Sequence, residues 1–481
     1  MAHATADLRT FLEDAQKEDL LLTIDKPVDV ETEIATLCSE TVKPTIFTNL
    51  KGYEDFRLTD CLTRFRDTQA LALGIPRGDP SIVLSSYLEK LAQGPGPTVT
   101  LNDAPNKEVI WTGNDVNLRR LPAPVPSEGL DFPHMWHGLG VHLKAEHFHI
   151  PTISGGLGVS KHPDGTLNTF FTMAQVVGRN KIQFFMFPGG HTERNVLAWA
   201  ERGERCPFAL VIGCHPIYEL GAVYTGPHPG FSELNLVSSL LGDAVPMVKC
   251  ESIDLEVPAL SEIVIEGKIN GKRKPYFHCS AHTDTYTPIV SLEPSFNVSA
   301  VTMRKNPIYR HIQPNRFTEH HSFGDFMLMA PMLQMLRAKQ LPVNDVHMPL
   351  HSCGNCAVIQ MTPNNKMEVR EAMQTAMANP IAPRLSIIVD DDINIYDFND
   401  VLYALSIRVH GTDDVEGFNG VRALAEPLTI LIKGPKDIEM RPNNRWAIDA
   451  TKPALDEPKH RLEWSRLRAR GEGRVKLADF V

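Results

Sequence analysis

The sequence lacks the features that mark membrane-spanning or secreted proteins. It has no run of about eighteen apolar residues, so we expect no transmembrane helix. Residues 1–20 contain no basic stretch followed by an apolar run, so they predict no signal peptide. Eight cysteines are scattered over 481 residues, a usage that predicts a reduced, cytoplasmic protein and argues against a disulfide scaffold.

An excess of positive charge is also absent. The formal net charge is -10. This balance argues against nucleic acid and against an anionic membrane surface as partners. It leaves a small anionic substrate open, because a local basic cluster can lie in an acidic protein. The length predicts roughly two to four domains and a core that is stable without crosslinks.

The first part of the chain, 1–107, predicts a small α/β domain, because helical and strand patterns alternate along it. Gly94-Pro95-Gly96-Pro97 then predicts a linker. The expected helices are 7–17, 30–40 and 82–92, and the expected strands are 20–24 and 45–47.

The middle part, 108–314, predicts a β-rich domain, for which a barrel fits best. Short strands and Gly/Pro turns follow one another there, and few helices are expected, the clearest at 193–202 and 232–241. The last part, 315–481, returns to an α/β pattern. A helix is expected over 323–339, kinked or started at Pro331.

A buried strand is expected at 385–392, between helices at 368–378 and 399–409. It ends in three acidic residues, and acids at the carboxyl end of such a strand usually lie in the crevice of an α/β sheet. The charged tail that starts at Pro453 is either a loose end or an arm that packs on another subunit.

Asn168, His191 and Glu233 are polar side chains at expected turns or strand ends. An amide oxygen, an imidazole and a carboxylate together suit Mn²⁺ or Mg²⁺. Their spacing alone does not establish a metal site, and the family resemblance given below is what supports one.

The run from His351 to Cys356 contains His-x-Cys-x-x-Cys, which could supply metal ligands through His351, Cys353 and Cys356. The sequence offers no evident fourth ligand and no second Cys-x-x-Cys. We therefore prefer a structural loop, with a metal or redox site as the alternative.

Several stretches together resemble the UbiD family of decarboxylases, which use prenylated FMN. They are Met247-Val248-Lys249-Cys250-Glu251, Val257-Pro258-Ala259 with Glu262-Ile263-Val264-Ile265-Glu266-Gly267, residues 389–408, and Ile448-Asp449-Ala450-Thr451. The resemblance runs from about residue 110 to 455. It implies an α/β (α+β) protein with an N-terminal α/β domain, a central split β-barrel that holds the flavin, and a C-terminal α/β oligomerisation domain. It also implies a carboxy-lyase that depends on a flavin prenyltransferase for its cofactor.

The resemblance implies roles for particular residues. Asn168, His191 and Glu233 would hold a divalent metal that bridges the flavin phosphate. A potassium ion would share Glu233 and take backbone carbonyls near Ala222 and Thr225. The residues expected to bind the cofactor are Asn168, Met173, Gly190, His191, Pro227, Glu233 and Arg445, with Arg445 in place of the family's usual lysine on the phosphate.

The chain departs from the family at the catalytic positions. Met173 stands where the family has an arginine, and the run from Phe277 to His282 lacks the family's two glutamates. A histidine oriented by a carboxylate is a competent acid or base near neutral pH. We therefore expect His282 to donate the proton, with Asp284 or His278 assisting. Glu319 and His320 are weaker catalytic candidates, and the alternative is that these residues only fill the pocket.

The resulting prediction is a non-oxidative, reversible decarboxylation of an aromatic or heteroaromatic acid by a homodimer or larger homo-oligomer. The cofactor would carry the difficult step, while the protein binds, orients and supplies a proton. Two alternatives stay open, a prenylated-FMN enzyme of altered reaction type and a non-catalytic binding or assembly subunit. The sequence leaves the substrate, the direction of reaction and the oligomer size open.

Overall fold

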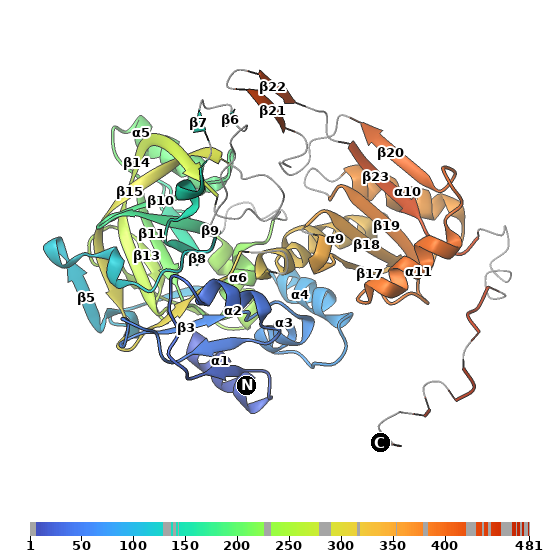
Figure 1. Cartoon of the computed structure of the whole chain (residues 1–481), viewed down its shortest axis with the longest axis horizontal. Helices are drawn as coiled ribbons and strands as arrows, with labels where there is room; N and C mark the ends of the chain where they lie inside the picture. Colours follow the sequence, from blue (N-terminus) through green and yellow to red (C-terminus); the bar gives the residue numbers. More distant parts are fainter. Residues whose placement is uncertain are drawn as a thin grey trace.

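The structure is a computed structural model of the chain. It describes residues 6–127, 136–137, 141–142, 144–225, 232–278, 290–314, 318–352, 354–378, 383–419, 430–434, 437–440 and 444–453, and parts of the tail (464–467, 469–471, 474–475 and 480). Figure 1 shows a strand-rich body, a helical N-terminal part beneath it and a separate α/β part that contains the later residues. This mixed helix and sheet architecture confirms the expected fold class.

The N-terminal part begins with a helix, α1 (Leu8–Lys17), whose start is set by its sequence. The Asp7 carboxylate accepts from the backbone N–H of Thr10, and the Thr10 hydroxyl accepts from the N–H of Asp7, which forms a capping box. The apolar residues at helical spacing form its buried face, as expected. The remaining N-terminal helices are α2 (Ile34–Glu40), α3 (Arg66–Leu73) and α4 (Ile82–Ala92).

The expected helix over 30–40 is wrong at its start, because α2 begins at Ile34. The Asp29 carboxylate accepts from the backbone N–H groups of Glu31 and Thr32, which holds the preceding residues in a turn. An aspartate that bonds to nearby backbone in this way competes with helix formation.

The N-terminal sheet has the order β1-β2-β3-β16. Its strands are β1 (Leu22–Ile24), β2 (Thr45–Phe47), β3 (Arg57–Asp60) and β16 (Ile308–Arg310). Since β16 pairs in parallel with β3, a strand from the end of the middle part completes the N-terminal sheet.

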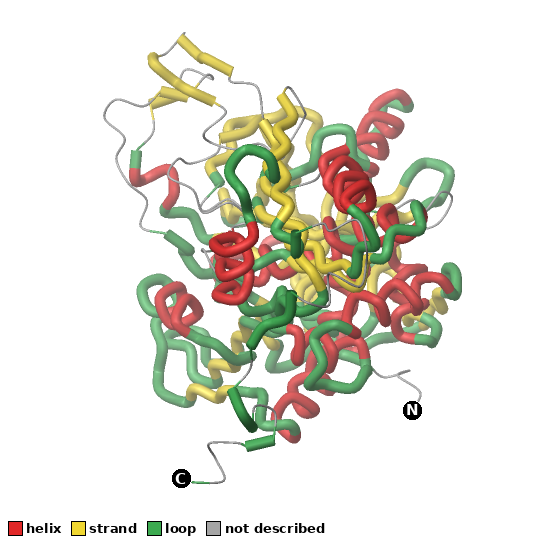
Figure 2. Tube along the Cα trace, turned by 90° about the vertical axis from the view of Figure 1, so that its right-hand side faces the viewer, coloured by secondary structure: helices red, strands yellow, loops and turns green. Residues whose placement is uncertain are grey.

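The central sheet has the order β10-β9-β8-β11-β14-β15-β5. β10 pairs with β9 on one side and with β15 on the other. The sheet therefore closes into a ring that consists of β8, β9, β10, β11, β14 and β15, and β5 lies outside it, beside β15. In Figure 2 the strands run through the middle of the molecule, with helices around them. The strands are β5 (Val109–Thr112), β8 (Thr152–Lys161), β9 (Leu167–Gly178), β10 (Lys181–Phe184), β11 (Pro207–Ile212), β14 (Ile263–Phe277) and β15 (Val290–Met303).

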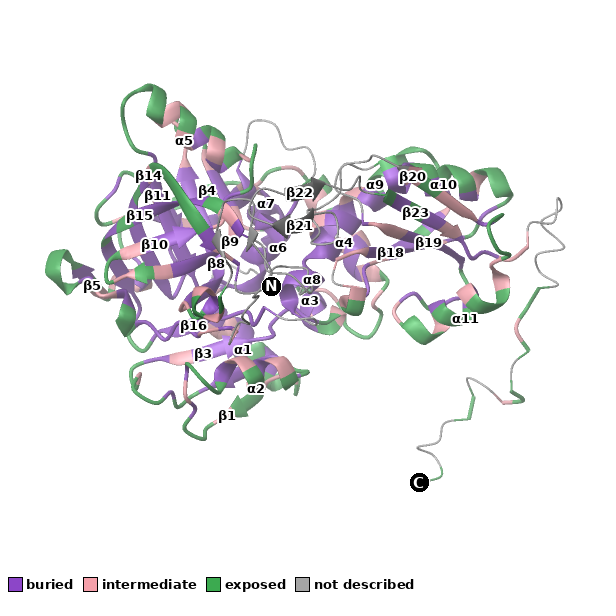
Figure 3. Cartoon of the chain, turned by 45° about the horizontal axis from the view of Figure 1, so that its top comes forward, coloured by how far each residue is buried: buried purple, intermediate pink, exposed green. Residues whose placement is uncertain are grey.

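The interior of this ring is packed by aromatic side chains. Phe184 and Phe208 stack with their ring centroids 4.4 Å apart, and Phe296 meets Phe208 edge-on at 5.1 Å. All three are fully buried. Gly158 lies against them, where an added Cβ would come within 2.5 Å of Phe170 and 3.0 Å of Phe208. Figure 3 shows the strands of the ring as largely buried.

Three helices pack on the outside of this sheet or next to it. They are α5 (His191–Glu201), α6 (Pro216–Ala222) and α7 (Glu233–Leu241). A small sheet of β4 (Thr98–Leu101), β12 (Val245–Lys249) and β13 (Glu256–Pro258) lies beside α7. Since β4 pairs in parallel with β12, a strand before residue 107 joins the central part. The domain limits 1–107, 108–314 and 315–481 stay predictions.

The C-terminal sheet has the order β17-β18-β19-β23-β20. Its strands are β17 (Val343–His347), β18 (Cys356–Met361), β19 (Leu385–Asp390), β20 (Val415–Asn419) and β23 (Asn444–Asp449). Its helices are α9 (Ala330–Ala338), α10 (Lys366–Ala378) and α11 (Phe398–Arg408). The expected helix over 323–339 is divided, because a π-helical turn (Asp325–Met329) precedes α9 and Pro331 lies in the first turn of α9.

Two short hairpins complete the described part of the chain. They consist of β6 (Trp136–His137) with β7 (Val141–His142) and of β21 (Ile430–Gly434) with β22 (Asp437–Met440). β21 lies beside β6, so the C-terminal part reaches over the central one (Figure 1). Within the described ranges, no helix combines the length and the hydropathy needed to span a bilayer.

The aromatic packing gives a test of the fold. We expect Phe208→Ala to lower the free energy of unfolding by about 3–5 kcal/mol, because it removes a buried ring and leaves a cavity. Leu197→Ala, at an exposed position of α5, is the control and should change it by less than about 0.5 kcal/mol. Denaturant unfolding measures both, and equal effects would contradict the ring interior described above.

Candidate active site

The structure brings together the three expected metal ligands. Asn168 lies at the start of β9, His191 is the first residue of α5 and Glu233 is the first residue of α7. The Nδ1 atom of His191 is 3.7 Å from Oε1 of Glu233. The other carboxylate oxygen of Glu233 accepts from the backbone N–H of Thr169 at 2.7 Å, next to Asn168.

Local contacts orient the Asn168 amide. Its Nδ2 donates to Oγ1 of Thr192 at 2.7 Å, in the first turn of α5. With the amide nitrogen held there, the amide oxygen is the atom available to a cation. Asn195 of the same helix donates to Ser160 Oγ at 3.0 Å, and Ser160 pairs with Asn168 across β8 and β9. The position of α5 therefore depends on the same strand pair that carries the ligand.

The turn before α5 places His191. Gly189 has a φ of +75°, a left-handed conformation that glycine adopts without strain. Its N–H donates to the Glu193 carboxylate at 2.6 Å, and Gly190 follows as the N-cap. Gly190 donates to the carbonyl of Phe187. Gly190 therefore determines where α5 begins and so where the His191 side chain lies. Its predicted contact with the cofactor stays a prediction.

The electrostatics of this group suit a divalent cation. The nearby Glu233 carboxylate raises the pKa of His191, against the opposing effect of partial burial. Glu233 itself is almost fully buried. A buried carboxylate beside an imidazole and an amide oxygen is a hard, oxygen-rich ligand set, so these residues fit the Mn²⁺ or Mg²⁺ expected from the sequence. Their metal-binding role stays a prediction.

The expected potassium ligands lie close to this helix pair. Ala222 is the last residue of α6, which packs against α7. Thr225 follows shortly after, and its hydroxyl donates to the carbonyl of Met327 at 2.5 Å. One predicted potassium ligand therefore lies in a helix that packs against α7, and the ion itself stays a prediction.

Arg445 lies in β23 of the C-terminal sheet and is fully buried. Its Nη1 donates to the carbonyl of Met377 near the end of α10, at 2.8 Å. Burial lowers its pKa, although an arginine stays charged at any physiological pH. Its expected pairing with a flavin phosphate stays a prediction.

Met173 is buried in the middle of β9. Its carbonyl accepts from the N–H of Phe185 at 3.0 Å and from the hydroxyl of Tyr276 at 3.3 Å. His278 packs edge-on against both of these rings, with centroid distances of 5.0 Å to Phe185 and 4.7 Å to Tyr276. The structure thus places two predicted site residues, Met173 and His278, in one aromatic cluster.

His278 also begins a chain of hydrogen bonds that sequence reasoning missed. Its Nε2 is 3.0 Å from the hydroxyl of Ser291, which donates to Oε1 of Glu293 at 2.6 Å. The other carboxylate oxygen of Glu293 accepts from the N–H of Met186 at 3.0 Å. Glu293 is buried in β15, and burial raises its pKa to about 7. A carboxylate at an inward-facing strand position was the signal available in the sequence.

Three predicted site residues lie outside the described residues. They are His282 and Asp284, in the segment 279–289, and Pro227, in the segment 226–231. Their roles as proton donor, assisting acid and flavin neighbour stay predictions. His278 is the last described residue before the first of these segments.

Glu319 and His320 are buried in the short helix α8 (Glu319–Ser322). Glu319 makes a buried ion pair with Arg310 at 2.9 Å and also bonds to Thr63. The Nε2 atom of His320 is 3.2 Å from the carbonyl of Ser154. These contacts connect parts of the fold, and a catalytic role for either residue stays a prediction.

Two places in the chain have cysteines that could take part in a metal site, the Cys-x-x-Cys run and the buried Cys38. Cys353 lies outside the described residues, while Cys356 begins β18, where burial raises the pKa of its thiol to about 12.

Elsewhere Cys38, Asp60 and His311 approach one another in the core. Both ring nitrogens of His311 are in contact with oxygen atoms, Nδ1 with Ser154 and Nε2 with Gln313, so the cluster is better explained as a buried hydrogen-bond network than as a metal site.

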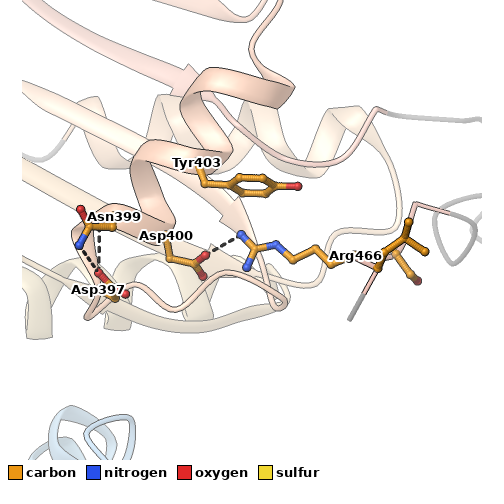
Figure 4. A pocket seen from close by; sticks show the side chains of 7 residues that line it. Asp397, Asn399, Asp400, Tyr403 and Arg466 are labelled. Carbon is orange, nitrogen blue, oxygen red and sulfur yellow. Dashed lines mark hydrogen bonds and ion pairs between the residues drawn. The ribbon is translucent and has the colours of Figure 1, made fainter. Parts of the chain in front are cut away.

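A shallow pocket lies away from these residues, between α11 and residues 464–467. Arg466 of the tail forms an ion pair with Asp400 and lies over the ring of Tyr403, 4.0 Å from its centroid (Figure 4). Asn399 and Asp397 bond to each other at the start of the helix. This contact is made within one chain, and the two expected alternatives, a loose end and an arm that packs on another subunit, both stay predictions.

Comparison with known proteins gives the class to which this architecture belongs. Three family models match in order along the chain, each described as part of 3-octaprenyl-4-hydroxybenzoate carboxy-lyase. They are the N-terminal domain at residues 12–83, the Rift-related domain at 98–317 and the C-terminal domain at 321–434.

Solved structures agree with this match. The UbiD-class enzyme HmfF from Pelotomaculum thermopropionicum, in an evolved dimeric form with prFMN, has a TM-score of 0.81 and 27% identity over 99% of this chain and 100% of that one. The 3,4-dihydroxybenzoic acid decarboxylase AroY of Klebsiella pneumoniae gives 0.80 and 22% over 97% of each chain. Vanillic acid decarboxylase of Sedimentibacter hydroxybenzoicus gives 0.75 and 21% over 98% and 97%. The last two, being more distant, show the fold alone.

The fold and the family models therefore define a carboxy-lyase. The chain belongs to the UbiD family, as the resemblance in its sequence indicated.

The metal ligands give a second test. We expect Glu233→Gln to lower the manganese content of protein dialysed against Mn²⁺ by at least about tenfold, because it removes the anionic member of the ligand set. Glu201→Gln, at the exposed end of α5, is the matched control and should bind as the wild type does. Elemental analysis measures the metal, and full retention in Glu233→Gln would exclude this site.

The raised pKa of Glu293 gives a third test. Because the folded protein binds this proton more tightly than the unfolded chain, the stability from the group is present at low pH and is lost as pH rises from about 4.5 through about 7. We expect Glu293→Gln to be more stable than the wild type by about 1–3 kcal/mol at pH 8.5, and to lose that advantage at pH 4. Urea unfolding at both values measures it. A difference independent of pH would show that Glu293 titrates normally, and Glu201→Gln is again the control.

Proposed function

We propose that the protein catalyses the non-oxidative, reversible decarboxylation of an aromatic or heteroaromatic carboxylic acid, with prenylated FMN and a divalent metal as cofactors. The convergence of Asn168, His191 and Glu233 carries this proposal, because a family member without catalysis has no evident need for a preformed site of this kind. A flavin prenyltransferase would supply the cofactor.

The substrate class rests on two observations. The names of the solved relatives include decarboxylases of 3,4-dihydroxybenzoic acid and vanillic acid, both aromatic. In this chain Phe185, Tyr276 and His278 form an aromatic cluster around the backbone of Met173. Flat aromatic walls suit a flat ring, and histidines could hydrogen bond to a ring nitrogen or a phenolic hydroxyl.

Particular residues would hold the cofactors. Asn168, His191 and Glu233 would hold the metal, and Arg445 would pair with the flavin phosphate. When bound, prenylated FMN supplies an electron sink for the electron pair left behind as carbon dioxide departs. The apolar surroundings of Met173 would favour this departure, since they keep water from the carboxylate and favour the neutral product.

The protein must also supply a proton to the carbon that loses its carboxylate. His282 remains our candidate donor, with Asp284 or His278 assisting, because an imidazole near a carboxylate can exchange a proton near neutral pH. His278, four positions earlier in the chain, is buried and hydrogen bonded to Ser291.

The proposal for the oligomeric state rests on the exposed surface of α11. α11 presents exposed apolar side chains, with Leu402 about half exposed and Ile407 at 65%. An exposed apolar helix face commonly marks a protein interface. We propose that the C-terminal part forms a homodimer or larger homo-oligomer through this face, in a cytoplasmic protein.

The proposed function is tested with protein co-expressed with a flavin prenyltransferase. Absorbance and mass analysis should show bound prenylated FMN, and a panel of hydroxybenzoic and heteroaromatic acids should yield carbon dioxide. Bound cofactor without carbon dioxide release would favour an altered reaction type. An empty site, or plain FMN, would favour a binding or assembly subunit.

The proton donor is tested in the loaded enzyme. We expect His282→Ala to lower kcat by about 10²–10⁴-fold while the flavin content stays unchanged, because the variant removes a proton donor but no expected cofactor ligand. His410→Ala is the control, since His410 is exposed in the C-terminal part. Full turnover by His282→Ala would rule out the assignment.

A further inference from the structure

The hydrogen bonds from His278 through Ser291 to Glu293 constrain where each proton lies. The Ser291 hydroxyl has a single hydrogen, which goes to Oε1 of Glu293, 2.6 Å away, whenever that carboxylate is ionised. An ionised carboxylate can only accept, so Ser291 must use its oxygen lone pair toward His278. Nε2 of His278, 3.0 Å away, is then the donor.

This direction selects one tautomer of the imidazole. A neutral histidine carries one N–H, and a proton on Nε2 leaves the lone pair on Nδ1. Nδ1 is therefore the basic nitrogen while Glu293 is ionised. The ring orientation is supported independently, because His278 packs edge-on against Phe185 and Tyr276.

Protonation of Glu293 reverses the direction. Oε2 already accepts from the backbone N–H of Met186, so an added proton belongs on Oε1, facing Ser291. Ser291 would then accept from Glu293 and donate to Nε2 of His278, which would move the imidazole proton to Nδ1. The raised pKa of Glu293, about 7, places this change near neutral pH.

Charged groups around Glu293 come from two neighbouring elements. Among the described residues they are Arg273 of β14 and Glu193 of α5, which form an ion pair and act on the Glu293 pKa in opposite directions. The contacts from β10 and the residues after it are polar but uncharged. The Met186 N–H donates to the Glu293 carboxylate, and the Gln183 side-chain amide donates to the Glu293 carbonyl. Lys274 of β14 lies opposite Glu293 in the strand register, but it is exposed whereas Glu293 is buried, and His278 is reached through Ser291.

We propose that Ser291 and Glu293 are positioning residues that determine which nitrogen of His278 carries its proton, and so make Nδ1 the nitrogen that exchanges a proton during the reaction. This inference rests on the proposed decarboxylase function for its chemical purpose. The tautomer itself is a property of the protein alone.

The tautomer can be measured without any cofactor. Long-range ¹H–¹⁵N NMR of protein labelled with ¹⁵N-histidine distinguishes the two neutral forms, and His278→Gln identifies the signal. At pH 8.5 we expect the Nε2–H form in the wild type. Glu293→Gln should give the Nδ1–H form, because its amide N–H₂ donates to Ser291 while its oxygen accepts from Met186. The same tautomer in both proteins, or the Nδ1–H form in the wild type at pH 8.5, would overturn the proposal.

Two variants of the serine give a second measurement. In a Ser291→Ala background, Glu293→Gln should no longer change the tautomer, since the connecting hydroxyl is gone. Ser291→Thr keeps a hydroxyl and should restore the change. Ser299→Ala, at an exposed position of the same strand, is the control and should leave the His278 signal as in the wild type.

Activity separates this inference from the proposed function. In the loaded enzyme we expect Glu293→Gln to lower kcat by about 10–100-fold, with KM changed by less than about threefold, because the wrong nitrogen carries the proton. If the tautomer switches but the wild type releases no carbon dioxide, the proposed function fails and the positioning role in the reaction fails with it. If the wild type releases carbon dioxide and the tautomer does not switch, this inference alone fails.

Discussion

One buried arginine joins the parts on which the candidate site depends. Arg310 is fully buried at the end of β16 and makes two parallel hydrogen bonds to Glu219 of α6, at 2.9 and 3.0 Å. It also pairs with Glu319 of α8, whose carboxylate accepts from Thr63 in the N-terminal part. An added Cβ at Gly155 would come within 2.9 Å of Arg310, so only glycine fits at this position of the strand beside the arginine. Breaking a buried pair of this kind typically costs about 3–5 kcal/mol, because a charge is left uncompensated.

The position of the candidate metal ligands depends on this network. Glu219 lies in α6, and α6 packs against α7, which begins at Glu233. A second ion pair, between Glu193 of α5 and Arg273 of β14, connects the helix that begins at His191 to the strand that leads to His278. The candidate metal ligands and the His278 cluster are therefore held by elements that share contacts.

The buried charges also explain why this region has unusual proton affinities. Burial, and then the nearby Glu319 carboxylate, raise the pKa of Asp60 to about 7. Burial lowers the pKa of His311 to about 3, so this imidazole stays neutral in the folded protein. Glu293 differs from both, because its carboxyl group is linked to His278 of the aromatic cluster by hydrogen bonds through Ser291. The same desolvation thus shifts the proton affinity of Asp60 and His311 in one place and of Glu293 in another.

Much of the fold could be predicted from the sequence because it depends on local patterns. The helix α4 and the strand β2 lie where periodicity placed them, and α7 begins one residue later than expected. The start of α2 could not be predicted in this way, since Asp29 bonds to the following backbone. The family could also be recognised from short motifs, and three family models agree with it.

The sequence by itself therefore determined the fold class, the family and the residue types from which a metal site could be built. Tertiary structure decided which of those residues meet. Asn168, His191 and Glu233 come together because three separate elements converge, and no spacing in the sequence records that convergence. Glu293 became visible as a partner of His278 only once β14 and β15 were paired. Hydrogen bonds and desolvation act through space over a few ångströms, and separation along the chain does not limit them.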